Sequence, residues 1–271
     1  MTGLRPITLI TGASSGIGLE LARVFARNGH ELVLVARRGE RLQALAHELE
    51  DVSETKPLVL PLDLRHPGVT AAIADAMLEH GVEPQYVVNN AGFGLVGPAD
   101  EVDRDTLLAM IDVNARVLTD LSLAFVDSLA RHRGGVLNVA SVAGFLPGPG
   151  SAVYYASKAY VVSFSEALYR ELKPRGVRVT ALCPGPVATE FAEVAGVRSG
   201  TAPEILAVSV EQVAQEGYRG LMAGRRIVMP GLANKLITLL MRFIPRGFLL
   251  NAVGSRQAKR RNQGSVIRHQ V

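Results

Sequence analysis

Short apolar runs alternate along this chain with longer amphipathic stretches, and this alternation constrains the fold more than any other feature. Seven runs have the composition and length of buried strands; they span residues 7–11, 31–36, 57–62, 85–89, 135–140, 177–183 and 226–229. Helical patterns lie between them, at residues 16–28, 39–50, 67–80, 104–132, 152–174 and 210–223. Strands that alternate with helices predict a doubly wound α/β fold, a seven-stranded parallel sheet with helices on both faces.

Length and cysteine content limit the organisation of the chain. Its 271 residues suffice for one large α/β domain, which we place at residues 1–231, followed by an extension over residues 232–271. The single cysteine, Cys183, excludes an internal disulfide and fits a reducing compartment; we interpret it as a small buried residue. The first apolar run begins at residue 7, which leaves no room for a signal peptide, so we expect a cytoplasmic protein.

Positive charge is concentrated near the C-terminus. From Tyr218 onward the chain has 11 Lys and Arg residues and no Asp or Glu, so the preceding part carries a net charge of −7 against +4 overall. The last basic residues have no interleaved aromatic residues and no recognised binding module, which argues against nucleic-acid binding. They are Arg256, Lys259, Arg260, Arg261 and Arg268.

The extension contains a basic amphipathic helical segment that ends at Pro245. Its polar face carries Lys235, Thr238 and Arg242, and these charges argue against a membrane span. The segment could lie on anionic lipid as a peripheral membrane contact, or pack across a subunit interface or over a substrate pocket. We favour packing, because apolar helix faces are more often buried in protein. The apolar face consists of Leu232, Leu236, Leu239, Leu240, Phe243 and Ile244.

Two side chains that can exchange a proton stand one helical turn apart. Tyr154 and Lys158 share a face of the helix predicted over residues 152–174. A nearby ammonium favours the phenolate and lowers a phenol pKa that is otherwise about 10. Ser141 adds a hydroxyl that can hold a carbonyl or alcohol oxygen beside Tyr154. The three residues predict a site that moves a proton at oxygen while another group moves a hydride at carbon.

A glycine-rich turn follows the first strand and begins the first helix. Glycines let the backbone turn tightly and approach a pyrophosphate, whose charge suits the free amides and dipole of a helix start. The alternative is a turn with a structural role only; the context of strand and helix favours the phosphate site. The predicted residues are Gly12, Ser14, Ser15, Gly16, Ile17 and Gly18.

These patterns occur in a recognisable order. Thr-Gly-x-x-x-Gly-Ile-Gly at residues 11–18 is followed by Asn-Asn-Ala-Gly at 89–92, Asn114, Ser141, Tyr154, Lys158 and Pro-Gly-x-x-x-Thr at 184–189. Together they closely resemble the short-chain dehydrogenase/reductase family over about residues 5–190. The resemblance implies a Rossmann fold, with residues 1–231 as its nucleotide-binding catalytic domain.

The resemblance also implies a role for each catalytic candidate. Tyr154 would be the general acid in carbonyl reduction and the general base in alcohol oxidation. Lys158 would bind the nicotinamide ribose hydroxyls and depress the phenol pKa. Ser141 would orient the substrate oxygen, and Asn114 would help carry a water relay from Lys158 to solvent. Tyr155 lies at the wrong spacing for this role, and we interpret it as packing or as a wall of the substrate pocket.

Further positions match the cofactor contacts of the family. Asp63 and Leu64 would contact the adenine ring, although Asp63 could instead cap the helix that starts near Pro67. Asn90, Ala91 and Gly92 would lie along the adenine ribose. The residues expected to close over the nicotinamide are Pro184, Gly185, Val187 and Thr189.

The second strand ends in basic residues, which bears on the choice of cofactor. An acidic residue normally stands there in NAD enzymes, whereas an arginine accommodates a 2′-phosphate. This chain has Arg37 and Arg38, with forked donors suited to phosphate. The alternative is a solvated basic start to the next helix. We predict NADP(H).

The combined features predict NADPH-dependent reduction of a ketone or aldehyde, or the reverse oxidation. The segment from Thr189 to Ser209 is mainly apolar, which favours an apolar small-molecule substrate; Arg198 could meet an acidic group. Alternatives are a 3-oxoacyl-thioester reductase and, from another class, a non-catalytic NADP-binding sensor or scaffold. Family analogy suggests a homodimer or homotetramer. No histidine pair has ligand spacing, so we expect no metal site.

Overall fold

A single parallel sheet forms the centre of the molecule. The computed structural model describes residues 3–50, 52, 55–187, 190–191, 206–241, 243–251 and 254. Within these residues the sheet has seven strands in the order β3-β2-β1-β4-β5-β6-β7, which confirms the predicted doubly wound architecture. The strands are β1 (Arg5–Thr11), β2 (Leu32–Val35), β3 (Leu58–Leu60), β4 (Val82–Asn89), β5 (Gly135–Val139), β6 (Arg178–Leu182) and β7 (Ile227–Val228).

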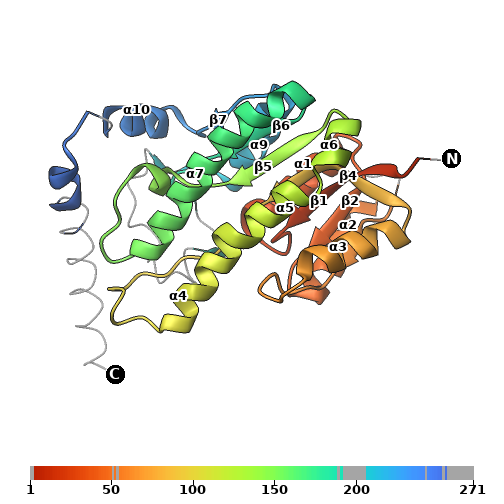
Figure 1. The fold of residues 1–271 in the computed structure, drawn as a ribbon, viewed down its shortest axis with the longest axis horizontal. Helices are drawn as coiled ribbons and strands as arrows, with labels where there is room; N and C mark the ends of the chain where they lie inside the picture. The colour runs from red at the N-terminus through yellow and green to blue at the C-terminus, as the bar shows by residue number, and fades with distance from the viewer. Residues whose placement is uncertain are drawn as a thin grey trace.

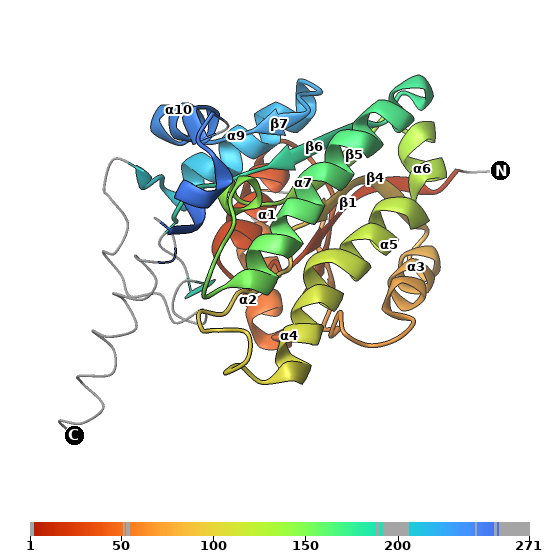
Figure 2. The ribbon, with the colours of Figure 1, turned by 60° about the vertical axis from the view of Figure 1, so that its left-hand side comes forward.

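Helices cover both faces of the sheet (Figures 1 and 2). One apolar cluster joins the sheet to α1 (Gly16–Arg27), α2 (Gly39–Glu50) and α9 (Val210–Met222). A second joins its other face to α3 (Val69–Glu79), α5 (Leu118–Ala124) and α7 (Ala152–Leu172). The central strands are buried on both sides, which explains why they appear in the sequence as nearly unbroken apolar runs.

The strand order places the predicted motifs at one edge of the sheet. β1 pairs with β2 on one side and with β4 on the other, so the connections from β1 and β3 run in opposite directions. Ligands of open α/β sheets bind outside the carboxyl ends of the strands at such a switch point. The glycine turn follows β1, Asn90 follows β4, Ser141 follows β5 and Pro184 follows β6.

The helix predicted over residues 104–132 is wrong as a single element. The structure divides it into α4 (Arg104–Ile111), the π-helical turn η1 (Asp112–Val117), α5 and α6 (Val126–Arg131). Asn114 lies within η1 and is fully buried, with its side chain bonded to the backbone of Phe93. A wider helical turn at a functional position is a common use of π-helix. Hydrophobic periodicity alone does not report it.

Ser209 and Gln212, three residues apart at the start of α9, have the spacing of a capping box, and only half of it forms. The Ser209 hydroxyl accepts a hydrogen bond from the Gln212 backbone N–H at 3.1 Å. The Gln212 side chain does not return this bond; it donates to Glu216 at 2.8 Å. At the start of α4, Asp103 caps the helix by accepting from the Thr106 backbone N–H at 2.8 Å.

The extension begins with α10 (Leu232–Met241), which turns Asn234 and Thr238 toward the protein. Asn234 and Thr238 are buried, whereas most of the predicted apolar face is exposed. The prediction that this face packs over a substrate pocket is therefore wrong, and contact across a subunit interface stays a prediction. In the part of the chain that is described, no helix is long and apolar enough to cross a membrane. The basic residues at 256–268 lie outside that part, and the division at residue 231 stays a prediction.

Candidate active site

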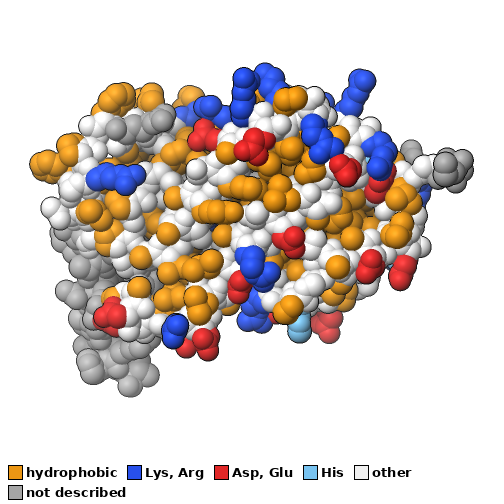
Figure 3. All heavy atoms as spheres, viewed as in Figure 1, with side chains coloured by type: hydrophobic (Ala, Val, Ile, Leu, Met, Phe, Trp, Pro, Cys, Tyr) orange, Lys and Arg blue, Asp and Glu red, His pale blue; other side chains and the backbone are white. Residues whose placement is uncertain are grey.

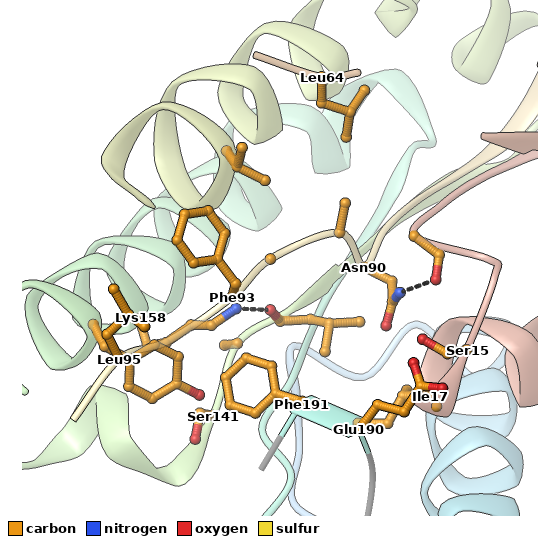
Figure 4. A pocket seen from close by; sticks show the side chains of 18 of the residues that line it. Ser15, Ile17, Leu64, Asn90, Phe93, Leu95, Ser141, Lys158, Glu190 and Phe191 are labelled. Carbon is orange, nitrogen blue, oxygen red and sulfur yellow. Dashed lines mark hydrogen bonds between the residues drawn. The ribbon is translucent and has the colours of Figure 1, made fainter. Parts of the chain in front are cut away.

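A cavity of about 900 Å³ lies at the carboxyl ends of the strands. Ser141 and Lys158 lie at one end of it, and Ser15, Ile17 and Glu190 lie at the other (Figure 4). Most of the residues predicted to bind cofactor or substrate line this cavity. They are Gly12, Ser14, Ser15, Gly16, Ile17, Arg37, Arg38, Asp63, Leu64, Asn90, Ala91, Gly92, Ser141, Tyr154, Tyr155, Lys158, Pro184, Gly185 and Val187.

Two of the predicted site residues that the structure describes, Gly18 and Asn114, do not line the cavity. Gly18 lies behind the glycine turn, where a Cβ would stand 2.3 Å from the Gly12 carbonyl oxygen and 2.3 Å from Asn90 Nδ2. Asn114 supports the cavity wall from within η1. Thr189 lies outside the described residues, as do Val194, Val197, Arg198 and Ile205 of the predicted substrate segment.

Hydrogen bonds fasten the glycine turn to the end of β4. Asn90 Nδ2 donates to the carbonyl oxygens of Thr11 and Gly12 at 3.0 and 3.2 Å. Thr11 Oγ1 accepts from the backbone N–H groups of Asn90 and Ala91, both at 3.1 Å. Gly12 adopts a positive φ of 67°, a conformation that favours glycine. The main role of the Asn90 side chain in the site is therefore to hold the glycine turn in place.

The start of α1 has the character of an anion site. Ser15 occupies the N-cap position, but its side chain makes no capping hydrogen bond to the helix. The first amides of α1 are thus left for another acceptor, and the helix dipole favours a negative one. With glycines that let the backbone approach closely, this end of the cavity fits a pyrophosphate.

Tyr154 and Lys158 project from α7 toward the end of β5. Ser141, which follows β5, lines the cavity together with both residues, and its hydroxyl lowers the pKa of the Tyr154 phenol. Lys158 is buried, and its Nζ donates to the Val139 carbonyl oxygen at 2.8 Å (Figure 4). Gly92 leaves room for the Asn114 side chain, since a Cβ there would stand 2.9 Å from Asn114 Oδ1.

Burial controls the ionisation of both side chains. It raises the pKa of Tyr154 to about 12, and among the described residues the hydrogen bond from Ser141 is what lowers it. Burial also lowers the pKa of Lys158 to about 8. The prediction that Lys158 depresses the Tyr154 pKa is therefore wrong for the chain without a ligand. The physical reason is that the phenolate loses its water while the ammonium is turned toward a backbone carbonyl.

Asn114 joins three elements beneath the site. Its Oδ1 accepts from the Phe93 N–H at 3.1 Å, and its Nδ2 donates to the Phe93 carbonyl at 2.9 Å. The same Nδ2 donates to Ser157 Oγ at 3.1 Å. Ser157 precedes Lys158 on α7, so Asn114 fixes the loop after β4 relative to the helix that carries the lysine. No local sequence pattern indicates Phe93 or Ser157 as its partners.

Asp63 is paired with a neighbour rather than capping a helix. Its carboxylate accepts from the Arg65 guanidinium at 2.6 Å and from the Arg65 N–H at 3.0 Å. The helix it could have capped, α3, has Gly68 at its N-cap position, so that alternative is wrong. The Arg65 hydrogen bond lowers the Asp63 pKa, and the charge of Arg37 contributes in the same direction.

Arginines gather beside the glycine turn. Arg38 donates to Ser15 Oγ at 2.7 Å and to Ser14 Oγ at 3.1 Å, and it pairs with Glu190 at 2.8 Å. Arg41 pairs with the same carboxylate at 2.5 Å. These two arginines lower the Glu190 pKa to about 2. Sequence reasoning missed Glu190 and Arg41, since no local pattern links residues that far apart.

Aromatic rings form the wall near Tyr154. The Tyr154 ring centroid lies 5.5 Å from that of Phe191 and 6.0 Å from that of Tyr155. Tyr155 lines the cavity, which agrees with its interpretation as a wall residue. Cys183 is fully buried and burial raises its pKa to about 12, which agrees with a structural residue. No group of three metal-binding side chains occurs among the described residues.

The chain is similar to known oxidoreductases. A family model described as short chain dehydrogenase matches residues 6–200. Sulfoacetaldehyde reductase 2 of Chromohalobacter salexigens is 42% identical over 68% of this chain and 74% of that protein. NADP-dependent 3-hydroxy acid dehydrogenase YdfG of Salmonella typhi is 37% identical over 69% of this chain and 75% of that protein. A short-chain dehydrogenase from Sphingobium yanoikuyae, solved in complex with NADPH, has a TM-score of 0.77 and 35% identity, covering 89% of this chain and 97% of that one.

Proposed function

This chain belongs to the short-chain dehydrogenase family, and we propose that Ser141, Tyr154 and Lys158 carry out its chemistry. It is an NADP-dependent oxidoreductase that interconverts alcohol and carbonyl groups. The observation that carries the proposal is the cavity itself. Ser141, Tyr154 and Lys158 line it at one end, and a glycine turn flanked by arginines lies at the other.

The residues around the glycine turn fit a phosphorylated dinucleotide. Gly12 and Gly16 line the cavity, and only a glycine lets the turn pack this closely, since a Cβ on Gly12 would stand 2.8 Å from Asn90 Nδ2. The first amides of α1 have no side-chain cap from Ser15. Arg37 and Arg38 line the same end and supply donors for a 2′-phosphate. NADP(H), when bound, supplies or accepts the hydride. The protein positions the reacting groups and moves the proton.

Tyr154 is the proton donor in the proposed reduction. Because its pKa is raised to about 12, the phenol is protonated at neutral pH and can donate to the oxygen of a carbonyl as that oxygen gains charge. Ser141 lines the cavity with this phenol, and its hydroxyl holds the same oxygen in line. Lys158 supplies positive charge near the phenol and a proton to replace the one that is donated.

The substrate proposed is a small carbonyl compound with a mainly apolar body. Phe191, Tyr155 and Leu146 line the end of the cavity that contains Tyr154. They offer apolar surface and few groups that could pair with a charged substrate. A panel of ketones and aldehydes with increasing apolar groups, assayed by loss of NADPH absorbance, identifies the preferred class. Acyl thioesters belong in the panel as the competing class.

The Tyr154→Phe variant tests the assignment of the proton donor. We expect turnover to fall by about 10³-fold or more, because the phenol hydrogen is lost while the ring remains. NADPH binding, measured by the fluorescence of its nicotinamide, should persist. Normal turnover in the variant would refute the role of Tyr154. A wild-type chain that binds NADPH but reduces nothing in the panel would favour a non-catalytic sensor.

A homo-oligomer is also proposed, formed through α4, α5 and α7. These helices lie side by side on one face of the molecule (Figure 1), and hydrophobic side chains gather there (Figure 3). Leu108, Ile111, Leu123 and Tyr160 are exposed on them. A contiguous apolar patch is a common mark of a protein interface.

A further inference from the structure

The helix α10 is inverted relative to an ordinary surface helix. Its polar residues Asn234 and Thr238 are 3% and 7% exposed, whereas Leu232 is 83% exposed. Asn234 Nδ2 donates to the carbonyl oxygens of Leu206 and Pro230 at 3.2 and 3.0 Å. These bonds satisfy the buried side-chain amide of Asn234 and fix the rotation of the helix. The outward position of its leucines is therefore set by the fold.

The outward residues form one exposed surface, which we call the apolar ridge. It continues beyond α10, since Phe243 is 81% exposed. Figure 3 shows hydrophobic side chains over α10, at the upper left of that view. A patch of this kind is rare on a protein that contacts only water. The apolar ridge consists of Leu232, Leu236, Leu239, Leu240, Phe243 and Phe248.

The charge around the apolar ridge selects its partner. Lys235 and Arg246 are exposed beside it, and no Asp or Glu occurs after Glu216 in the sequence. The last basic residues of the chain follow within the same C-terminal segment. A second copy of the chain, packed ridge to ridge, would bring the same cations together without any acidic residue of this segment to pair with them. An anionic phospholipid surface complements both the apolar side chains of the ridge and the positive charge beside them, because it has apolar chains beneath anionic head groups.

We propose that the apolar ridge docks on an anionic phospholipid surface. The leucines and phenylalanines enter the boundary between head groups and acyl chains, while Lys235 and Arg246 pair with phosphate groups. The helix lies in the plane of the surface, since no described helix is long and apolar enough to span a bilayer.

Vesicle sedimentation with the full chain tests the proposal. We expect co-sedimentation with vesicles of phosphatidylcholine mixed with phosphatidylglycerol, and weaker binding to phosphatidylcholine alone or at high salt. The double variant Leu236→Ser/Leu239→Ser should lose about tenfold in affinity for each leucine. Its turnover in solution should not change, because both side chains point into solvent. The matched control is Val52→Ser/Leu78→Ser, two exposed apolar residues just after α2 and on α3.

A fluorescent reporter gives an independent measurement, because the chain has no tryptophan. Phe243→Trp places a single indole on the apolar ridge, and its emission should shift to shorter wavelength when anionic vesicles are added. Leu78→Trp places the indole on α3, where no shift is expected. The proposal is overturned if neither sedimentation nor emission responds to anionic vesicles, or if ridge and control variants bind alike. It is also overturned if the ridge substitutions abolish self-association while the wild type ignores vesicles.

Discussion

Burial favours the neutral form of both Tyr154 and Lys158. The neutral form suits the proposed role of Tyr154 but not that of Lys158. A neutral phenol is the form that donates a proton, so a Tyr154 pKa of about 12 suits carbonyl reduction. Lys158 is useful as a cation, and its pKa of about 8 leaves the ammonium only narrowly favoured at neutral pH. Lys158 is therefore the group that should limit the reaction as the pH rises.

The pH profile of reduction tests this conclusion. The ammonium of Lys158 is present below pH 8 and lost above it, so kcat/KM for NADPH should be constant below about pH 8 and fall above it. This parameter reports the groups of the free enzyme. In Lys158→Met, which has no titrating group at this position, the residual activity should lack the fall. A wild-type profile that stays level to pH 10 would show that Lys158 is not the titrating residue.

Glu190 competes for the arginines that we assign to the 2′-phosphate. It pairs with Arg38 and Arg41, and a phosphate that binds Arg38 must replace it there. Glu190→Gln removes the competing charge, so the Kd for NADPH should decrease by about two- to fivefold, the range of an exposed ion pair. The Kd for NADH should stay unchanged, because NADH has no such phosphate.

Direct titration of the two nucleotides measures this effect. Glu40→Gln, which removes the same charge from the first turn of α2, is the control and should leave both constants unchanged. If Glu190→Gln strengthens NADPH and NADH equally, Glu190 acts by general repulsion and not by occupying Arg38.

At the scale of elements, the local motifs were more predictable than the residues that hold them in place. The glycine turn, Ser141 and the pair on α7 each occupy a few residues at a strand end or on one helix face, so their spacing fixes their geometry. The π-helical turn at Asn114 depends on the backbone of Phe93 and on Ser157, which reach it only through the fold. Sequence periodicity therefore predicted one helix where the structure has four pieces.

The contact between the glycine turn and α1 provides a test at this scale. In Gly18→Ala the new methyl group would overlap the Gly12 carbonyl oxygen at 2.3 Å, so the turn must move away from the helix start. We expect a loss of about 1–3 kcal/mol in the free energy of unfolding. NADPH affinity should fall by about tenfold or more, since the amides no longer converge. Chemical denaturation and nucleotide titration measure the two effects.

Gly247→Ala is the matched control for that variant. A Cβ there meets nothing within 4 Å, and its φ is not in the positive range. Its stability and NADPH affinity should equal those of the wild type. A Gly18→Ala protein with unchanged NADPH affinity would show that the turn does not depend on this close approach.

At the scale of the whole molecule, the sequence could not predict contacts between residues that lie far apart in the chain. A parallel sheet with helices on both faces follows from the alternation of strands and helices, but the order of the strands does not, because doubly wound sheets occur in more than one order. The pair Arg38–Glu190 joins residues 152 positions apart and leaves no local pattern. The rotation of α10 also leaves no local pattern. Its apolar face suggests burial, and only the bonds of Asn234 in the structure show that Asn234 is the residue turned inward.

Two exposed apolar surfaces then require separate explanations, and the face of α4, α5 and α7 is the one assigned to self-association. Tyr160 and Thr119 join α7 to α5 through a hydrogen bond of 2.8 Å, so this face is a rigid surface. Leu123→Lys places a charge on it without disturbing the core, since Leu123 is exposed. In a two-fold dimer the charge occurs twice, so we expect dissociation to monomers by sedimentation velocity. Leu78→Lys on α3 and the ridge variant Leu236→Ser/Leu239→Ser should sediment as the wild type does; a Leu123→Lys protein that also does so would place the interface elsewhere.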